Sequence, residues 1–168
     1  MSAQAPDERD DVYLDPSELS RLEVVGMASG LLLFISLFLP WYGTSGHPDS
    51  FIGKVGDGAS ASAWQTFGIL DIALLALSFA PFILSWILAR RHKLDWPTGE
   101  VTMVTGLIGI FLVLCNGLIL GKPGDGVEIS LEIGWFLGLL GCVGIFVAGL
   151  LRQAERAGPR GRKPPGSV

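Results

Sequence analysis

The sequence predicts an all-α integral membrane protein, a bundle of four transmembrane helices with both termini in the cytoplasm. The prediction rests on the composition, on four long apolar segments and on an uneven distribution of positive charge. Of the 168 residues, 49% are hydrophobic and 17% are charged, a balance more apolar than that of an ordinary soluble domain. The transmembrane domain is expected over residues 24–151, between an acidic N-terminal segment (1–23) and a basic C-terminal tail (152–168).

Each of the four apolar segments is long enough to cross a bilayer as a helix. A hydrocarbon core of about 30 Å needs about 20 residues of helix, because backbone groups there cannot bond to water and must bond to one another. The predicted spans are residues 24–40, 64–89, 101–120 and 131–151.

The first helix is expected to begin before the membrane and to be retained. Residues 15–18 read Asp-Pro-Ser-Glu, with the cap, first-turn proline and acid of a helix N-terminus. A cleaved signal peptide would carry a small-residue cleavage site directly behind its apolar stretch. The small residues 59–63 lie too far beyond that stretch, and the preceding segment is long and acidic.

Positive charge predicts the orientation. Of the 12 lysines and arginines, only Lys54 and Lys122 fall in the loops after the first and third spans. The rest lie in the N-terminal segment, the middle loop and the tail, which the positive-inside rule assigns to the cytoplasm. Aromatic residues at the span ends are then expected as interfacial belts, the outer one comprising Trp41, Tyr42, Trp64 and Trp135 and the inner one Trp86 and Trp96.

Small and polar residues recur along one face of every predicted span. Transmembrane helices associate through such faces, since lipid tails are as apolar as leucine, and Pro81 is expected to kink the second helix. Gly134 and Gly138 suit packing within the bundle or a GxxxG contact with a second copy, so a homo-oligomer is a candidate assembly. The four faces consist of Gly26, Ser29, Gly30 and Ser36; Asp71, Ser78 and Ser85; Thr102, Thr105, Gly109 and Asn116; and Gly134, Gly138, Gly141 and Ala148.

Asp71 is the candidate intramembrane polar site, together with Asn116. It lies about two turns inside the outer end of its helix, where an ionisable group is costly and is a functional candidate by default. Two interpretations remain open. Asp71 couples the movement of a proton or cation, or it is a structural carboxyl that bonds across the bundle to Asn116. No second buried acid or base completes a relay, which favours the structural interpretation.

The two outer loops share the pattern Gly-Lys-x-Gly-Asp-Gly, at residues 53–58 and 121–126. Each copy follows an odd-numbered span, which suggests two tandem helical hairpins related by a pseudo-two-fold axis along the membrane normal. Asp57 and Asp125 are candidates for binding a cation or a partner. Asp-Gly is also an ordinary turn dipeptide, and we favour the turn interpretation.

No cofactor or metal site is predicted. Cys115 and Cys142 lie in apolar runs without zinc or redox spacing, and His47 and His92 fall on opposite sides of the membrane. The tail is expected to signal topology, with contact to anionic lipid as the alternative, and nucleic acid is not an expected partner.

The residues Leu37 to Gly43, then Ser62-Ala63-Trp64 with Asp71 following, resemble a group of small uncharacterised four-helix membrane proteins common in actinobacteria. The stretches Lys122-Pro123-Gly124 and Gly134 to Leu139 are similar to the same group. The resemblance implies a bacterial plasma membrane and brings no known activity.

The sequence favours a non-enzymatic structural or accessory component of the envelope, which presents the outer loop 41–63 to an envelope protein. The alternative is a small transporter or ion-conducting oligomer that uses Asp71. An enzyme ranks last, because the loops hold no nucleophile with a base, no metal-ligand set and no phosphate loop.

Overall fold

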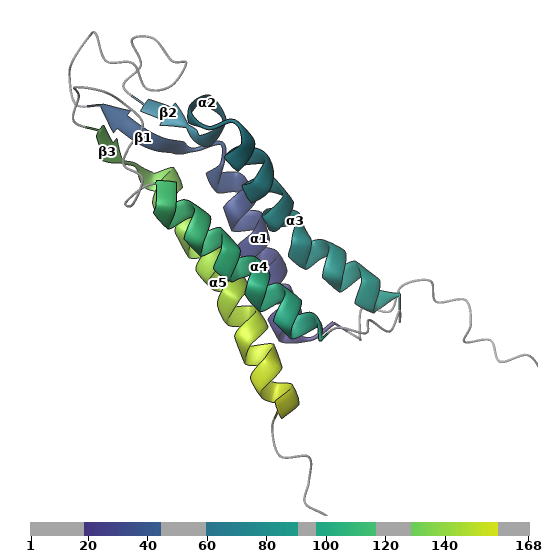
Figure 1. Cartoon of the computed structure of the whole chain (residues 1–168). Helices are drawn as coiled ribbons and strands as arrows, with labels where there is room; N and C mark the ends of the chain where they lie inside the picture. The colour runs from purple at the N-terminus through teal and green to yellow at the C-terminus, as the bar shows by residue number, and fades with distance from the viewer. Residues whose placement is uncertain (1–18, 45–59, 91–96, 117–128, 158–168) are drawn as a thin grey trace, which may run out of the picture.

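The computed structural model describes residues 19–44, 60–90, 97–116 and 129–157. Most of them are helical, as predicted, and four long helices lie side by side with a small sheet at one end of the bundle (Figure 1). The elements in chain order are α1 (Arg21–Ser36), β1 (Pro40–Thr44), β2 (Ser60–Ser62), α2 (Ala63–Thr66), α3 (Ile69–Ala89), α4 (Thr98–Leu114), β3 (Ile129–Leu131) and α5 (Ile133–Ala157).

The sheet was not predicted, so the fold is not purely helical. Its order is β2-β1-β3, and both outer strands pair antiparallel with β1. Tyr42 lies opposite Ala61 on one side and Leu131 on the other. The sheet therefore joins the segment after α1 to the segments before α2 and α5; we call this end of the bundle the sheet end.

The first helix is shorter than the predicted span. Ser20 and Glu23 form its capping box: Glu23 N donates to Ser20 Oγ at 3.3 Å, and Ser20 N donates to Glu23 Oε2 at 2.6 Å. These bonds satisfy orphan donors of the first turn. The cap proposed at residues 15–18 lies outside the described residues. The helix ends at Ser36 rather than at residue 40, because the chain turns over residues 37–39 into β1.

The second predicted span is broken. Residues 63–66 form the single turn α2, whose Ser62 N donates to Gln65 Oε1 at 2.9 Å. Phe67 then takes an extended conformation and Gly68 precedes α3, so the apolar helix itself is Ile69–Ala89. Pro81 lies inside it, as predicted.

The last two helices begin and end differently from the predicted spans. α4 begins three residues early, at Thr98, and α5 runs from Ile133 to Ala157, beyond the predicted limit at residue 151. Among the described residues, two helices are long and apolar enough to cross a membrane by length and composition, Ile69–Ala89 and Ile133–Glu155, while Thr98–Leu114 is a shorter apolar helix.

Close packing is strongest between α5 and its two neighbours, α1 and α4. Gly106 and Gly149 face the backbone of the opposite helix, so a Cβ at either position would collide with main-chain atoms. Gly141 is similar, since its Cβ would lie 2.9 Å from Leu33 N. The predicted small-residue faces do point inward, because most of their members are buried, including Gly26, Gly30, Ser36, Asp71, Ser78, Ser85, Thr102, Thr105 and Gly109.

The bundle does not show the two-fold symmetry that a tandem duplication predicts. The pairs α1–α3 and α4–α5 are hairpins of neighbouring helices, as proposed. Symmetry would make the α3–α4 contact as extensive as the α1–α5 contact, whereas α3 packs mainly on α1 and lies loosely against α4. Towards its C-terminal end, α3 leans away from the other helices (Figure 1).

Candidate functional site

Asp71 lies in the first turn of α3, directly after the break that separates α3 from α2. Its residue surface is only 2% exposed, and Oδ1 has no hydrogen-bond partner among the described residues. Ser78 and Ser85 follow on the same face at intervals of two turns, and both are buried. The candidate site is therefore a buried carboxyl near the sheet end.

The structure does not join Asp71 to Asn116. The Asn116 amide Nδ2 donates to Leu112 O of its own helix at 2.9 Å, and the Asn116 main-chain oxygen accepts a hydrogen bond from Tyr42 Oη at 2.9 Å. The cross-bundle bond expected from their similar depth is absent from the described structure. Leaving a buried polar group unpaired costs about 1–3 kcal/mol, so Asp71 destabilises the fold unless it is neutral or bonds to a group outside the described residues.

Aromatic side chains form the core between the sheet and the helices. Trp41 and Tyr42 are fully buried, and both rings meet Phe67 edge to face at centroid distances of 5.7 and 5.8 Å. Trp41 Nε1 donates to Ser36 O at 2.7 Å, and Trp135 Nε1 donates to Val113 O at 3.3 Å. Burial raises the pKa of Tyr42 to about 12, because the phenolate would lose its hydration.

The predicted outer aromatic belt is thus wrong for three of its four residues. Trp41, Tyr42 and Trp135 are buried, with each polar atom bonded to a main-chain carbonyl. Such bonding lets a buried Trp or Tyr avoid water. Trp64 is exposed, as an interfacial residue should be. On the predicted inner side Trp86 is exposed as well, and Trp96 lies outside the described residues.

The pair Gly134 and Gly138 accommodates Trp41. A Cβ at Gly134 would lie 2.5 Å from Trp41 Cδ1, and one at Gly138 would lie 2.8 Å from Trp41 Cζ2. Both glycines are buried within the chain. The face expected to contact a second copy is therefore occupied by the chain's own tryptophan, and a homo-oligomer would need another surface.

The opposite end of the bundle holds a buried ion pair that the sequence did not reveal. Arg152 Nη1 pairs with Glu23 Oε1, and the two side chains are 13% and 4% exposed. Nearby, Gln153 Nε2 donates to Glu100 Oε1 at 3.2 Å. We call this end the ion-pair end. Glu23 and Arg152 belong to the bundle, whereas the sequence assigned them to the acidic segment and the basic tail.

The sequence contained signals for two features that the predictions missed, the N-terminal cap of α1 and the three-stranded sheet. The Ser20–Glu23 spacing is that of a capping box, but residues 15–18 offered a competing one. The strand segments are rich in Ser, Tyr, Trp and Ile, yet three to five residues each is too short for a periodic pattern. Asp57 and Asp125 lie outside the described residues.

Known chemistry does not identify the site. In the described part of the chain, no group of three or more His, Cys, Asp or Glu side chains could hold a metal ion. Cys142 is buried against Gly109, and Cys115 is partly exposed. Comparisons of the chain with protein-family models, curated proteins and solved structures gave no match.

Proposed function

We propose that the chain is a four-span protein of the bacterial plasma membrane and a non-enzymatic structural or accessory component of the envelope. The observation that supports this most is the outward-facing surface of the helices. Soluble proteins rarely expose large contiguous apolar patches, and here every long helix exposes bulky apolar side chains while its small and polar residues lie inside. These include Val24, Leu31 and Ile35; Ile72, Phe79 and Ile83; Leu107, Ile108 and Phe111; and Phe136, Leu140 and Leu150.

The two shorter helices also fit a membrane position. With 16 and 17 residues, α1 and α4 extend about 24–26 Å at 1.5 Å per residue, somewhat less than a hydrocarbon core of about 30 Å. The buried aromatic residues and the sheet lie next to the ends of these helices. On this proposal, they fill the part of the hydrocarbon core that the two short helices do not cross. Irregular backbone is tolerated at membrane depth when protein buries it.

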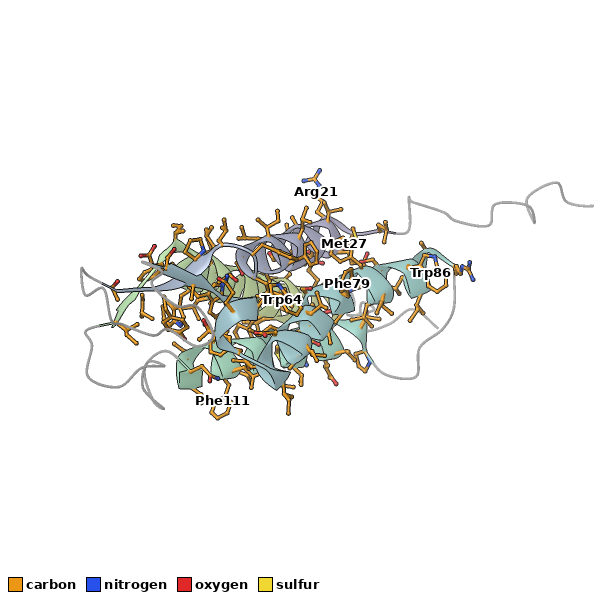
Figure 2. All side chains as sticks on the ribbon, turned by 90° about the horizontal axis from the view of Figure 1, so that it is seen from above. Arg21, Met27, Trp64, Phe79, Trp86 and Phe111 are labelled. Carbon is orange, nitrogen blue, oxygen red and sulfur yellow. The ribbon has the colours of Figure 1, made fainter. Side chains whose placement is uncertain are left out.

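The ion-pair end carries the features of a cytoplasmic interface. Arg90 lies over the Trp86 ring at 3.9 Å from its centroid, a pairing of apolar body and charged head that suits the lipid headgroup region. Figure 2 places Trp86 at the end of α3 and shows Phe111 projecting from the side of the bundle. Among the described residues, Arg21, Arg90 and Arg152 lie at this end, and ten of the 12 lysines and arginines fall in the segments predicted to be cytoplasmic. This charge distribution supports an outward-facing sheet end.

On this proposal, the function of the bundle is to hold a rigid outer platform. Three strands from separate parts of the chain converge there, and Trp41, Tyr42 and Phe67 anchor them to the helices. The platform carries the outer loops and presents them to an envelope protein partner. Rigid elements hold a recognition surface more accurately than free loops do.

Transport through Asp71 is the second candidate. Its support is the buried carboxyl of Asp71, whose Oδ1 has no hydrogen-bond partner among the described residues. A transported ion would need a path to the carboxyl. Asp71 does not line either of two cavities among the described residues, one between Glu23 and Arg152 and one beside Val104.

One set of experiments tests both candidates. Alkaline phosphatase fused within residues 45–59 should be active, while fusions within residues 91–96 or after residue 157 should be inactive; the reverse would contradict the orientation. Proton and cation flux into liposomes should be absent from wild type and from Asp71→Asn. Flux in wild type that survives Ser78→Ala but vanishes in folded Asp71→Asn would make transport the primary function and refute the structural one.

A further inference from the structure

One side of α3 exposes apolar side chains along the half of the helix that leads to the ion-pair end. Phe79, Ile83 and Trp86 are 47%, 54% and 49% exposed, and Arg90 follows at the C-cap. Intervals of four, three and four residues place these positions on one side of a helix. We call these four residues the α3 face. The opposite side of the helix is buried and consists of Ser78, Pro81, Ser85 and Ala89.

The described helices leave the α3 face about half uncovered. α3 packs mainly on α1 and lies loosely against α4, and its C-terminal end leans away from the other helices (Figure 1). Contact with α1 comes from the buried side, where Pro81 Cβ lies 3.8 Å from the position of a Cβ at Gly26. Phe79 also meets Phe34 of α1 edge to face at 5.7 Å, which borders the face on that side.

Arg90 gives the α3 face a charged end. Its guanidinium carbon lies 3.9 Å from the centroid of the Trp86 ring, so the planar group is stacked on the indole. A guanidinium stacked in this way directs its N–H donors outward in its own plane, in a geometry that matches the oxygens of a phosphate group. The indole N–H of Trp86 is a further donor. The face thus combines an apolar tract with a group that recognises phosphate.

The length of the α3 face matches one leaflet of a bilayer. Arg90 follows Phe79 by 11 residues, which rise about 16 Å at 1.5 Å per residue. Half of a hydrocarbon core of about 30 Å is about 15 Å. With Arg90 at the level of the headgroups, Phe79 therefore lies near the middle of the membrane, and an acyl chain can follow the face over its whole length.

We propose that the α3 face binds an anionic phospholipid of the cytoplasmic leaflet. Arg90 bonds to the phosphate, Trp86 lies at the level of the headgroup, and one acyl chain runs along Ile83 to Phe79. Charge complementarity selects the headgroup, because the guanidinium is positive and an anionic phospholipid has a net negative charge. The lipid covers the side of α3 that the bundle leaves open.

Native mass spectrometry of protein purified in mild detergent tests the lipid site. The protein is incubated with equal amounts of phosphatidylglycerol and phosphatidylcholine that have the same acyl chains. Wild type should retain phosphatidylglycerol several-fold more than phosphatidylcholine, and Arg90→Gln should lose this preference. Arg21→Gln is the matched control, because it removes an exposed arginine at the start of α1, which lies apart from Trp86 (Figure 2); it should keep the preference.

Three results would overturn the proposal. Wild type retains the two lipids equally, Arg90→Gln keeps the wild-type preference, or Arg21→Gln loses as much of it as Arg90→Gln does. The third result would mean that net positive charge at this end, rather than the α3 face, attracts the lipid.

A second measurement covers the case in which Arg90→Gln fails to fold. Bromine atoms on an acyl chain quench the fluorescence of a tryptophan that they contact, and the difference between wild type and Trp86→Phe isolates the signal of Trp86. This signal should be quenched at a lower content of brominated phosphatidylglycerol than of brominated phosphatidylcholine. Equal quenching by the two lipids would overturn the proposal.

The lipid site rests on the membrane position proposed above, and the phosphatase fusions test that position separately. Fusions with the expected activities, together with equal binding of the two lipids, would overturn the lipid site and leave the membrane position intact. A reversed pattern of fusion activities would overturn both, because Arg90 would then lie in the outer leaflet.

Discussion

Adding one methyl group at Gly138 should destabilise the sheet end, because Trp41 fills the space above that glycine. The new Cβ would lie 2.8 Å from Trp41 Cζ2 and 3.1 Å from both Trp41 Cη2 and Ser36 Oγ, whereas unstrained carbon atoms approach to about 3.5–4.0 Å. The indole cannot easily retreat, since Trp41 is fully buried and Nε1 is bonded to Ser36 O.

The expected cost of Gly138→Ala is that of overpacking a core, about 1–3 kcal/mol. For a chain of this size each kcal/mol lowers the melting temperature by about 2–4 °C, so the shift should be about 2–12 °C. Thermal unfolding in mild detergent measures it. Gly68→Ala is the matched control, because a Cβ there meets nothing within 4 Å, and it should change stability by less than about 0.5 kcal/mol.

A double mutant identifies Trp41 as the cause. Phe lacks the indole atoms that the new methyl group would strike, so Gly138→Ala should cost less in a Trp41→Phe background than in wild type. An undiminished cost in that background, or a Gly138→Ala variant as stable as Gly68→Ala, would refute the assignment. A melting temperature that depends on protein concentration in wild type but not in Gly138→Ala would instead favour the GxxxG contact between two copies.

Two further predictions concern Tyr42 and the ion pair. Ultraviolet titration should show one tyrosine ionising near pH 12 and not near the ordinary pKa of 10.0, and Tyr42→Phe should abolish this late step. The folded protein retains the phenolic proton longer than the unfolded chain, so this contribution to stability is complete below pH 10 and is lost between pH 10 and 12; a single titration near pH 10 would contradict the burial. Arg152→Ala should cost about 3–5 kcal/mol, because it leaves the Glu23 charge buried without its partner, and pairing it with Glu23→Gln should restore part of the loss. Gln153→Ala, which removes only an exposed hydrogen bond, should change the melting temperature far less, and equal losses in the two single variants would refute the ion pair.

Much of the helical architecture could be predicted because its signals are local. Four apolar stretches gave the four long helices, and the recurrence of small residues gave the faces that point inward, such as Gly26 and Gly30 of α1. These patterns repeat at the helical period over several turns, so errors at single positions average out. The boundaries were less accurate, since capping groups and turns compete within a few residues at each end.

The candidate site was predicted only as far as one residue. Asp71 does face the interior, as its spacing from Ser78 and Ser85 indicated. Its proposed partner was wrong: two side chains at similar depth need not meet, and the Asn116 amide is bonded within its own helix. The predicted aromatic belt failed for a related reason, because Trp41 and Tyr42 suit a lipid interface and a buried core equally well.

The sequence by itself determined the helical class and the inward faces of the helices, and the orientation of the termini stays a prediction from the placement of charge. Composition, periodicity and charge placement carry that information without reference to contacts. Only the tertiary structure decided that three short strands form a sheet, that Gly134 and Gly138 receive Trp41, and that Glu23 pairs with Arg152. Each of these features joins residues far apart in the chain, and their pairing depends on how the helices pack in three dimensions.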